Sequence, residues 1–363
     1  MFSARLFSAR PPVAVALASA LALATSSPAG ATVKQEGSAS TSRYIQVNLV
    51  SDVAGLAPVT DPNLVNAWGL TQGPTTPLWV SDNATDVSTL YRSGPPAAIV
   101  PIVVSIDGGA PTGTAFNGTS GFVLSANGIS AAARFLFAGE NGDITAWNPT
   151  VTGTTAVRVA GTAGAVYKGL ALVADPTAPR LLAANFHDNR IDVFDSAFMP
   201  VRDRHAFRSI GIPHGYAPFN LVVLGGKVFV SYAKQDAARH DDVAGAGHGF
   251  INVYDTNGRF LQHLVRRGVL DSPWGMAVAP TGFGSLSGKL LVGNFGNGRI
   301  HAFDPLTGRL LATLRGTDGA PITIDGLWGL LPGNGSSAAT TDVWLSAGPG
   351  GESHGLLGVL RLG

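Results

Sequence analysis

A repeated pattern runs through most of the chain and limits what it can fold into. A glycine inside a short apolar segment recurs at positions 69, 121, 169, 275 and 329, and Asn220 stands in its place in a weaker copy. The intervals are 52, 48, 51, 55 and 54 residues. A period of this length is typical of repeat proteins, in which each unit buries its apolar face against its neighbours. The sequence therefore predicts six similar structural units.

Each unit contains further segments with the composition of β-strands. An apolar segment follows the glycine at 78–83, 135–141, 181–186, 228–233, 290–295 and 343–348. An alternating segment comes next at 87–91, 143–148, 190–195, 250–255, 299–304 and 356–362. A fourth apolar segment lies at 97–106, 154–160, 204–210, 260–265 and 309–314. Alternation of apolar and polar residues with β-branched and aromatic side chains indicates strands, and the Asn-Gly and Asp-Asn pairs between them favour turns.

Four strands in each unit of about fifty residues predict a β-propeller. The sixth unit ends without a fourth strand, whereas Tyr44–Val50 precedes the first unit and has no unit of its own. We expect this segment to complete the last blade, which closes the ring and leaves no open sheet edge. The predicted fold is an all-β, six-bladed β-propeller with four antiparallel strands per blade, formed by residues 44–363 as a single domain. No helical pattern alternates with the strands, which argues against an α/β fold.

The first 31 residues have the pattern of a secretory signal peptide. Arg5 and Arg10 precede an apolar run over 13–24, and Ala29-Gly30-Ala31 is a small-residue cleavage site. The run is too short to cross a bilayer as a helix, which needs about 20 residues. We expect cleavage after Ala31, a flexible segment over 32–43, and an exported protein in the periplasm or outside the cell, without a membrane span.

Composition excludes several classes of function. The chain has no cysteine, so it forms no disulfide, zinc–thiolate or iron–sulfur site. Its formal net charge is +1 and its basic residues are dispersed, which argues against a nucleic-acid partner. We expect a monomer that binds a protein, a glycan or a small molecule.

Several segments resemble a family of exported, largely uncharacterised bacterial proteins with six-bladed, NHL-like β-propellers. The resemblance rests on DPNLVNAWGL (61–70), LWVSDN (78–83), PWGMAVAP (273–280) and DGLWGL (325–330), and it extends over 44–363. It implies export and the propeller fold, and it implies no catalytic residues. Through the fold alone the chain is also similar to calcium-dependent lactonases, and a fold does not determine a function.

A propeller brings two sets of loops together near its axis, and loops held by a rigid scaffold often carry binding residues. These loops precede the innermost strands or join the second and third strands of each unit. The predicted ligand-binding residues are Asn66, Asp82, Asn117, Glu140, Lys168, Asn185, His214, His248, Asn294 and Asp325. The longest loop, 233–249, adds His240, Asp241 and Asp242, and an insertion of this length often has a function.

Two kinds of chemistry could be built on these loops. Asn66, Asn117, Glu140, Asn185 and Asp325 could supply oxygen ligands for calcium, although asparagine and aspartate at such places also cap turns. The histidines could bind a transition metal or transfer protons, with His187 and His354 as candidate general bases, or they could be separate solvated side chains. No metal-binding spacing such as H-E-x-x-H and no G-x-S-x-G motif is present.

The sequence favours an exported binding or interaction module with a ligand site on this loop face. The alternative is a metal-dependent, calcium-using hydrolase or lactonase with its site on the same face. A third hypothesis is a structural protein of the cell surface. The sequence leaves the cofactor unknown, with calcium as the one candidate.

Overall fold

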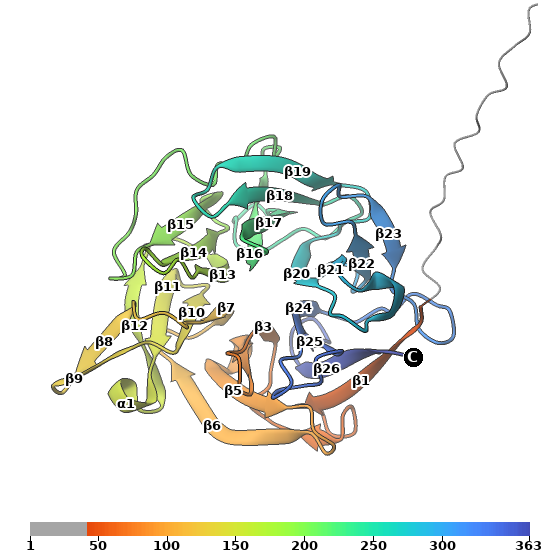
Figure 1. Cartoon of the computed structure of the whole chain (residues 1–363), viewed down its shortest axis with the longest axis horizontal. Helices are drawn as coiled ribbons and strands as arrows, with labels where there is room; N and C mark the ends of the chain where they lie inside the picture. Colours follow the sequence, from red (N-terminus) through yellow and green to blue (C-terminus); the bar gives the residue numbers. More distant parts are fainter. Residues whose placement is uncertain (1–41) are drawn as a thin grey trace, which may run out of the picture. The chain divides into compact units, whose positions relative to one another are not determined.

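The computed structural model describes residues 42–363 as an all-β, propeller-like arrangement of sheets around a central axis (Figure 1). The predicted signal peptide and nearly all of the predicted lead-in over 32–43 lie outside the described residues. Among residues 42–363, no helix is long and apolar enough to cross a membrane.

Antiparallel meanders account for most of the fold. The first two form β3 (Ala67–Thr71), β4 (Leu78–Asp82), β5 (Val87–Arg92) and β6 (Ala98–Ile106), then β7 (Pro111–Phe116), β10 (Phe135–Gly139), β11 (Asp143–Trp147) and β12 (Thr155–Gly161). The third contains β13 (Tyr167–Val173), β14 (Arg180–Asn185) and β15 (Arg190–Phe194). Two four-stranded sheets follow: β16 (Tyr216–Leu224), β17 (Lys227–Lys234), β18 (Gly249–Asp255) and β19 (Phe260–Arg266), then β20 (Pro273–Val278), β21 (Leu290–Asn294), β22 (Ile300–Phe303) and β23 (Leu310–Thr313).

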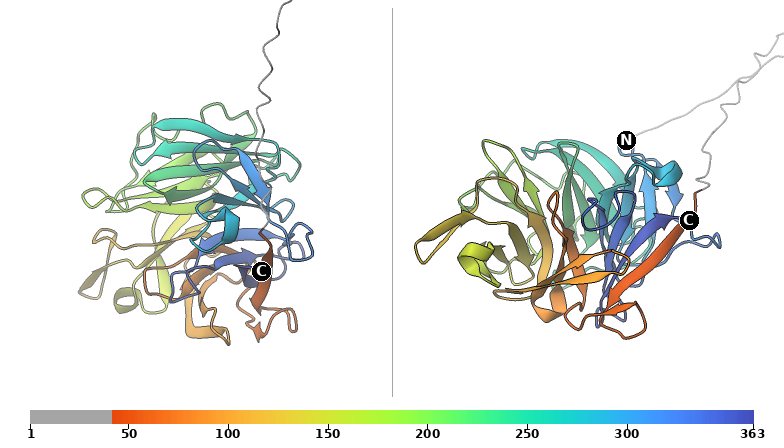
Figure 2. Two further views of the ribbon diagram at one scale, coloured as in Figure 1. Left: turned by 45° about the vertical axis from the view of Figure 1, so that its right-hand side comes forward. Right: turned by 60° about the horizontal axis from the view of Figure 1, so that its bottom comes forward.

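The two ends of the chain share one sheet, as the sequence predicts. β24 (Leu327–Pro332), β25 (Val343–Ala347) and β26 (Leu356–Leu362) are extended by β1 (Tyr44–Ser51) and the short β2 (Val59–Thr60). β1 pairs antiparallel with β26 from Tyr44–Leu362 to Ser51–Leu356, and Figure 2 shows the two strands side by side. The first strand thus covers the edge that β26 would otherwise expose.

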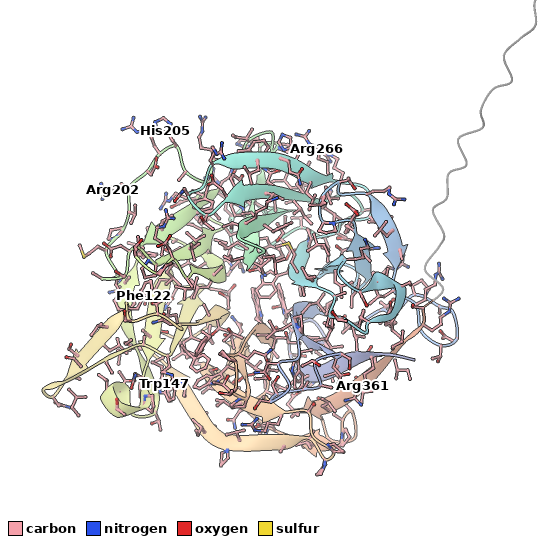
Figure 3. The ribbon with its side chains drawn as sticks, in the orientation of Figure 1. Phe122, Trp147, Arg202, His205, Arg266 and Arg361 are labelled. Carbon is pink, nitrogen blue, oxygen red and sulfur yellow. The ribbon has the colours of Figure 1, made fainter. Side chains whose placement is uncertain are left out.

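The sheets differ from the prediction of six separate four-stranded blades. β6 pairs in parallel with β12, which joins the first two meanders into one eight-stranded sheet. The third sheet has three strands, because the predicted strand over 204–210 is a loop. Phe207 in this loop has a φ of +50°, which a strand does not permit. Arg202 and His205 of the same connection lie at the periphery (Figure 3).

The repeating glycine belongs to the innermost strands, and one of its predicted positions is wrong. In the second meander the innermost strand is β7, so Gly113 takes the place that the sequence assigned to Gly121. The hairpin β8 (Val123–Ala126) and β9 (Ile129–Ala132), which is inserted between β7 and β10, shifts the spacing. A Cβ on Gly113 would lie 2.2 Å from the backbone nitrogen of Leu170, so only glycine allows this approach of β7 to β13.

The core lies between the faces of successive sheets and at the axis. A separate axial group, here called the aromatic plug, consists of Trp68, Phe186, Phe219, Trp274, Phe295 and Trp328. Trp68 stacks on Trp328 with 3.5 Å between ring centroids, and Trp274 meets both rings edge-on. The helical elements within residues 42–363 are short: α1 (Pro149–Thr152), η1 (Asn83–Thr85) and η2 (Gly284–Leu286).

Candidate functional site

Polar side chains gather at one end of the axis, where the innermost strands begin. We call this end the loop face. The group, here called the axial cluster, consists of Asn66, Asn83, Glu140, Lys168, Asp241 and Glu352. Its members come from four different sheets or their loops, so the cluster exists only in the folded chain.

Lys168 is the centre of the cluster. Its residue is 1% exposed, although lysine is almost never fully buried without partners. The Nζ atom donates hydrogen bonds to Glu140 Oε1 and to Asp241 Oδ1, the latter at 3.0 Å. The same nitrogen lies 5.2 Å from the ring centroid of Trp68, which adds a cation–π contact. The ammonium is therefore held between two carboxylates and the aromatic plug.

Two asparagines connect the remaining members. Asn66 Nδ2 donates to Glu352 Oε2 at 2.8 Å and to Asn83 Oδ1 at 3.2 Å. Asn83 Nδ2 donates to the second carboxylate oxygen of Glu140 at 3.1 Å. Trp328 Nε1 donates to Asn66 Oδ1 at 3.0 Å, so the plug also orients this amide.

The long loop between β17 and β18 reaches the axis and supplies Asp241. Its base is fixed by an isolated bridge between Gln235 and Asp242, and Gln235 Nε2 donates to the carbonyl of Phe186 at 2.6 Å. His240 Nδ1 lies 2.9 Å from Asp241 Oδ1. The side chain of Asp241 is 65% exposed and that of His240 is 46% exposed, so this part of the site faces solvent.

Carboxylates outnumber cations in this region. Burial alone would lower the pKa of Lys168, but the carboxylates of Glu140 and Asp241 raise it. Burial raises the pKa of Glu352, and the nearby carboxylates of Glu140 and Asp241 act in the same direction. Burial likewise raises the pKa of Asp242, which also interacts with Lys168 and Asp241. One lysine thus faces four acidic side chains.

Three side chains could hold a metal ion. Donor atoms of Glu140, His240 and Asp241 all lie within 4.8 Å of one another. Lys168 already bonds both of these carboxylates, so a divalent cation would compete with a resident ammonium for the same oxygens. The donor set fits an ion only if Lys168 moves aside.

Four of the residues named from the sequence come together here, namely Asn66, Glu140, Lys168 and Asp241. Asn117 does not reach the loop face, because it follows β7 at the opposite end of the innermost strand. Its amide donates to the carbonyls of Gly121 and Ala133, and its Oδ1 accepts from Thr119, which is the turn-capping role of asparagine.

Four further predicted residues bond within their own surroundings instead. Buried Asp82 accepts a hydrogen bond from Thr89 Oγ1 at 2.7 Å. Asn185 Nδ2 donates to Asp188 and Asp192, and Asn294 Nδ2 donates to the carbonyl of Val269. Asp325 Oδ2 accepts from the backbone nitrogen of Gly350 at 2.9 Å. The five proposed calcium ligands therefore do not converge, since only Asn66 and Glu140 belong to the axial cluster.

The predicted histidines are dispersed over different loops. His187 Nδ1 lies 2.8 Å from Asp188, and His354 Nδ1 lies 2.9 Å from Asp52. His248 Nδ1 lies 2.8 Å from the carbonyl of Val243, and His214 is exposed in the turn before β16. Each of the two candidate bases thus bonds a different acid, and no shared reacting position is formed between them.

Glu352 is the member that sequence reasoning missed. It lies in the loop between β25 and β26, the same place in its unit that Glu140 occupies between β10 and β11. From this loop, only His354 was predicted, as a candidate general base. The position in the repeat, applied equally to every carboxylate, would have identified Glu352.

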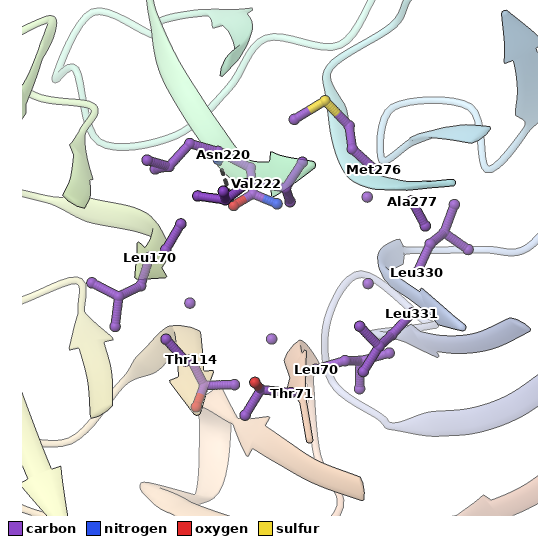
Figure 4. A pocket seen from close by; sticks show the side chains of 18 of the residues that line it. Leu70, Thr71, Thr114, Leu170, Asn220, Val222, Met276, Ala277, Leu330 and Leu331 are labelled. Atoms are coloured by element: carbon purple, nitrogen blue, oxygen red, sulfur yellow. Dashed lines mark hydrogen bonds between the residues drawn. The ribbon is translucent and has the colours of Figure 1, made fainter. Parts of the chain in front are cut away.

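A cavity of about 370 Å³ occupies the axis beyond the plug (Figure 4). This axial channel is lined by the innermost strands β3, β7, β13, β16, β20 and β24, from Gly69, Gly113, Leu170, Asn220, Trp274 and Gly329 onward. The axial cluster contacts the opposite side of the plug, through Lys168 on Trp68 and Trp328 on Asn66. No pattern in the sequence predicts this channel.

The amino-acid sequence is similar to that of known viral proteins. Two uncharacterized proteins of Acanthamoeba polyphaga mimivirus are 33% and 34% identical to this chain. The matches cover 78% and 86% of the chain and 72% and 84% of the viral proteins. No described protein-family profile matches the chain.

Solved structures with the same fold include a streptogramin B lyase and the α-L-arabinanase of Penicillium chrysogenum in complex with arabinobiose. The TM-scores are 0.52 and 0.54, at 11% and 14% identity. The matches cover 88% and 86% of this chain and 97% of each of the other two. At such identities they establish the β-propeller fold alone.

Proposed function

This chain belongs to the same protein family as the two uncharacterized mimivirus proteins, and we propose that it is a binding module that holds a cationic ligand group at the loop face. The observation that carries the proposal is Lys168, an ammonium that the protein itself holds between carboxylates and an aromatic ring. Lys168 bonds Glu140 and Asp241, and the carboxylates of Glu352 and Asp242 also interact with it, so acidic side chains outnumber the one cation and a second positive group is favoured there.

The scaffold in this proposal is a six-bladed, NHL-like propeller. The innermost strands contact one another in the cyclic order β3, β7, β13, β16, β20, β24 and back to β3. Between successive members lie six separate apolar clusters. These observations support six blades, with the first two joined through β6 and β12.

The accessible part of the site is formed by Asp241, His240 and Glu352. The side chain of Asp241 is 65% exposed, and Glu352 is held by a hydrogen bond from Asn66 to one of its carboxylate oxygens. A primary or secondary ammonium, from a polyamine or a basic peptide side chain, could donate to both. Charge-assisted hydrogen bonds of this kind contribute about 1.5–3 kcal/mol each.

Spermidine is a suitable first probe for this site. We expect saturable binding in isothermal titration calorimetry at low salt, and at least roughly tenfold weaker binding after Asp241→Asn or Glu352→Gln. Asp318→Asn removes an equally negative but exposed side chain outside the cluster and serves as the matched control. Equal affinity of all four proteins, or no binding by the unmodified one, would contradict the proposal.

A metal-dependent hydrolase is the second candidate, and the Glu140–His240–Asp241 group favours it. The test is a thermal melt after chelation, with calcium, zinc, manganese or copper then added back. An ion at 100 times its Kd adds about 2.7 kcal/mol to the stability of the native state. A selective rise of several degrees with one ion would favour the metal site over the Lys168-centred site.

We also propose that the protein is exported as a monomer after cleavage at Ala31. The support is the sequence pattern over 1–31. Mass spectrometry of the secreted protein should find Thr32 at the N-terminus, and light scattering should give the mass of one chain.

A further inference from the structure

We propose that the axial channel is a second binding site, which takes a neutral small molecule with a single aliphatic chain. The site lies on the far side of the aromatic plug from the axial cluster, so it is separate from the cation site proposed above. Its volume, about 370 Å³, lies within the usual range for small-molecule sites, roughly 300–1,000 Å³.

The chemistry of the lining selects the ligand. None of the 25 lining residues is an aspartate, glutamate, lysine, arginine or histidine. Aliphatic side chains such as Leu70, Leu170, Val222, Met276 and Leu331 surround the space (Figure 4). A charged group would lose its hydration in such a channel without gaining a partner, which is costly.

The few polar side chains of the lining already have partners. Thr71 Oγ1 accepts from the backbone nitrogen of Phe116 at 3.0 Å, and Thr114 Oγ1 donates to the carbonyl of Leu136 at 3.1 Å. Asn220 Nδ2 donates to the carbonyl of Trp274 at 2.8 Å. They therefore offer a ligand little hydrogen bonding, and apolar contact has to supply the affinity.

The channel has one closed end. Trp274 belongs both to the lining and to the plug, where it meets Trp68 and Trp328 edge-on. The lining becomes half-buried rather than buried toward the ends of the innermost strands, at Leu172, Leu224 and Pro332. A ligand therefore enters from the face opposite the axial cluster, with its chain toward the plug and its polar end toward water.

Water is the natural competitor for this space. Cavities with few polar partners hold water poorly, because a water molecule needs two to four of them. Displacing poorly ordered water by an apolar group increases affinity. Because Thr71, Thr114 and Asn220 already have partners within the protein, an alkyl chain competes with water in the channel mainly through apolar contact.

A series of n-alkanols tests the proposal directly. We expect 1-hexanol, 1-octanol and 1-decanol to bind with one site per chain in calorimetry, each added CH₂ tightening binding by about fourfold until the channel is full. A terminally brominated alkanol should quench the fluorescence of Trp274 and its plug neighbours, and unlabelled 1-decanol should reverse the quenching. Affinity that does not change with chain length, or quenching that 1-decanol does not reverse, would overturn the proposal.

Two variants place the site in the channel. Val222→Glu puts a carboxylate among the half-buried lining, and Val222→Phe fills the space without a charge; each should weaken 1-decanol binding at least tenfold. Leu306→Glu makes the same change at a side chain that is 70% exposed outside the channel, and it should bind as the unmodified protein does. If neither Val222 variant folds, the alkanol series on the unmodified protein decides alone.

The outcome is independent of the cation site. Asp241→Asn and Glu352→Gln should leave 1-decanol binding unchanged, whereas Val222→Phe should leave spermidine binding unchanged. Association with phosphatidylcholine vesicles without saturable alkanol binding would contradict a small-molecule site and indicate a membrane surface instead.

Discussion

The two ends of the axis differ in chemistry although the same strands build both. On β13, Lys168 belongs to the axial cluster, while Leu170, two residues further on, lines the channel. One end holds an ammonium among four acids, and the other holds no titratable side chain among its lining residues. The aromatic plug between them keeps the charges away from the apolar space.

This difference shows how a propeller separates two kinds of chemistry. The acidic side chains of the charged end come from loops of different lengths and its lysine comes from β13, whereas the regular innermost strands alone supply the neutral end. The low dielectric beside Trp68 strengthens the attraction between charges that have partners. A space lined by alkyl groups avoids the cost of burying unpaired charges, because it contains no charged group. The following predictions test this separation, from the largest expected effect to the smallest.

The largest effect is expected at the charged end. Lys168→Met leaves Glu140 and Asp241 near each other without their shared cation. Breaking a buried ion pair costs about 3–5 kcal/mol. Only the Lys168–Glu140 pair is buried, because the side chain of Asp241 is 65% exposed, so we expect a loss at the lower end of that range. Leu170→Met on the same strand is the control, and this volume-conserving change should cost less than about 1.5 kcal/mol. Urea unfolding measures both. Similar losses for the two variants would show that Lys168 acts by packing alone.

The loss of folding stability at low pH should come from a residue that belongs to neither the axial cluster nor the channel lining. His301 is 3% exposed, and burial together with Arg299 lowers its pKa to about 4 from an ordinary value near 6.5. The unfolded chain takes up a proton before the folded one does, so stability is lost as the pH falls from about 6.5 to 4. The loss should approach about 3 kcal/mol. His301→Asn should reduce this loss, whereas the exposed His205→Asn should not, as measured by unfolding at several pH values.

The neutral end should tolerate no added atom at Gly113. A Cβ there would meet the backbone of Gly169 and Leu170 at 2.2–2.8 Å, so Gly113→Ala should cost about 2 kcal/mol. Gly121→Ala is the matched test, because its Cβ would meet Ser196 Cβ at 2.7 Å and Pro179 at 3.2 Å, contacts that are longer than those at Gly113 and that involve no backbone atom. Gly113→Ala should therefore lower the Tm of thermal unfolding more than Gly121→Ala does. The reverse order would indicate that Gly121, rather than Gly113, lies in the innermost strand.

The smallest effect distinguishes the two ends by pH. Burial raises the pKa of Glu352, so this side chain takes up a proton above the usual pH range of glutamate. As the pH is lowered through this raised pKa, the carboxylate of Glu352 becomes neutral, so the affinity for spermidine should fall several-fold. Binding of 1-decanol should stay constant, because the channel lining has no titratable group. Parallel pH titrations by calorimetry check both, and an equal pH dependence would mean that one site binds both ligands.

The sequence predicted the strands well where each unit follows the same pattern. The segments at 78–83, 228–233 and 290–295 lie on β4, β17 and β21, and Tyr44–Val50 lies on β1 beside β26. It failed where one unit departs from the pattern. The β8–β9 insertion moved the apparent glycine from 113 to 121, and it carried Asn117 into the predicted site by the same error.

The candidate site was predicted only in part. Asn66, Glu140 and Lys168 were named from their place in the repeat, and the structure brings them together. Glu352 was overlooked, although its place in the repeat matches that of Glu140. Asp82, Asn185 and Asn294 hold similar places and yet bond outside the cluster: Asp82 and Asn185 bond within their own sheets, and Asn294 bonds the carbonyl of Val269 in the connection between β19 and β20. The direction of each side chain depends on local packing that no spacing reveals.

By itself the sequence determined the repeat, the all-β composition and the segment that joins the two ends of the chain, because alternation and periodicity are local properties. Only the tertiary structure decided which carboxylates share Lys168 and that the axis is divided by the plug. These contacts join residues as far apart as Asn66 and Glu352, which meet 286 positions apart at 2.8 Å. Such contacts depend on how the sheets pack around the axis, and no local pattern records that packing.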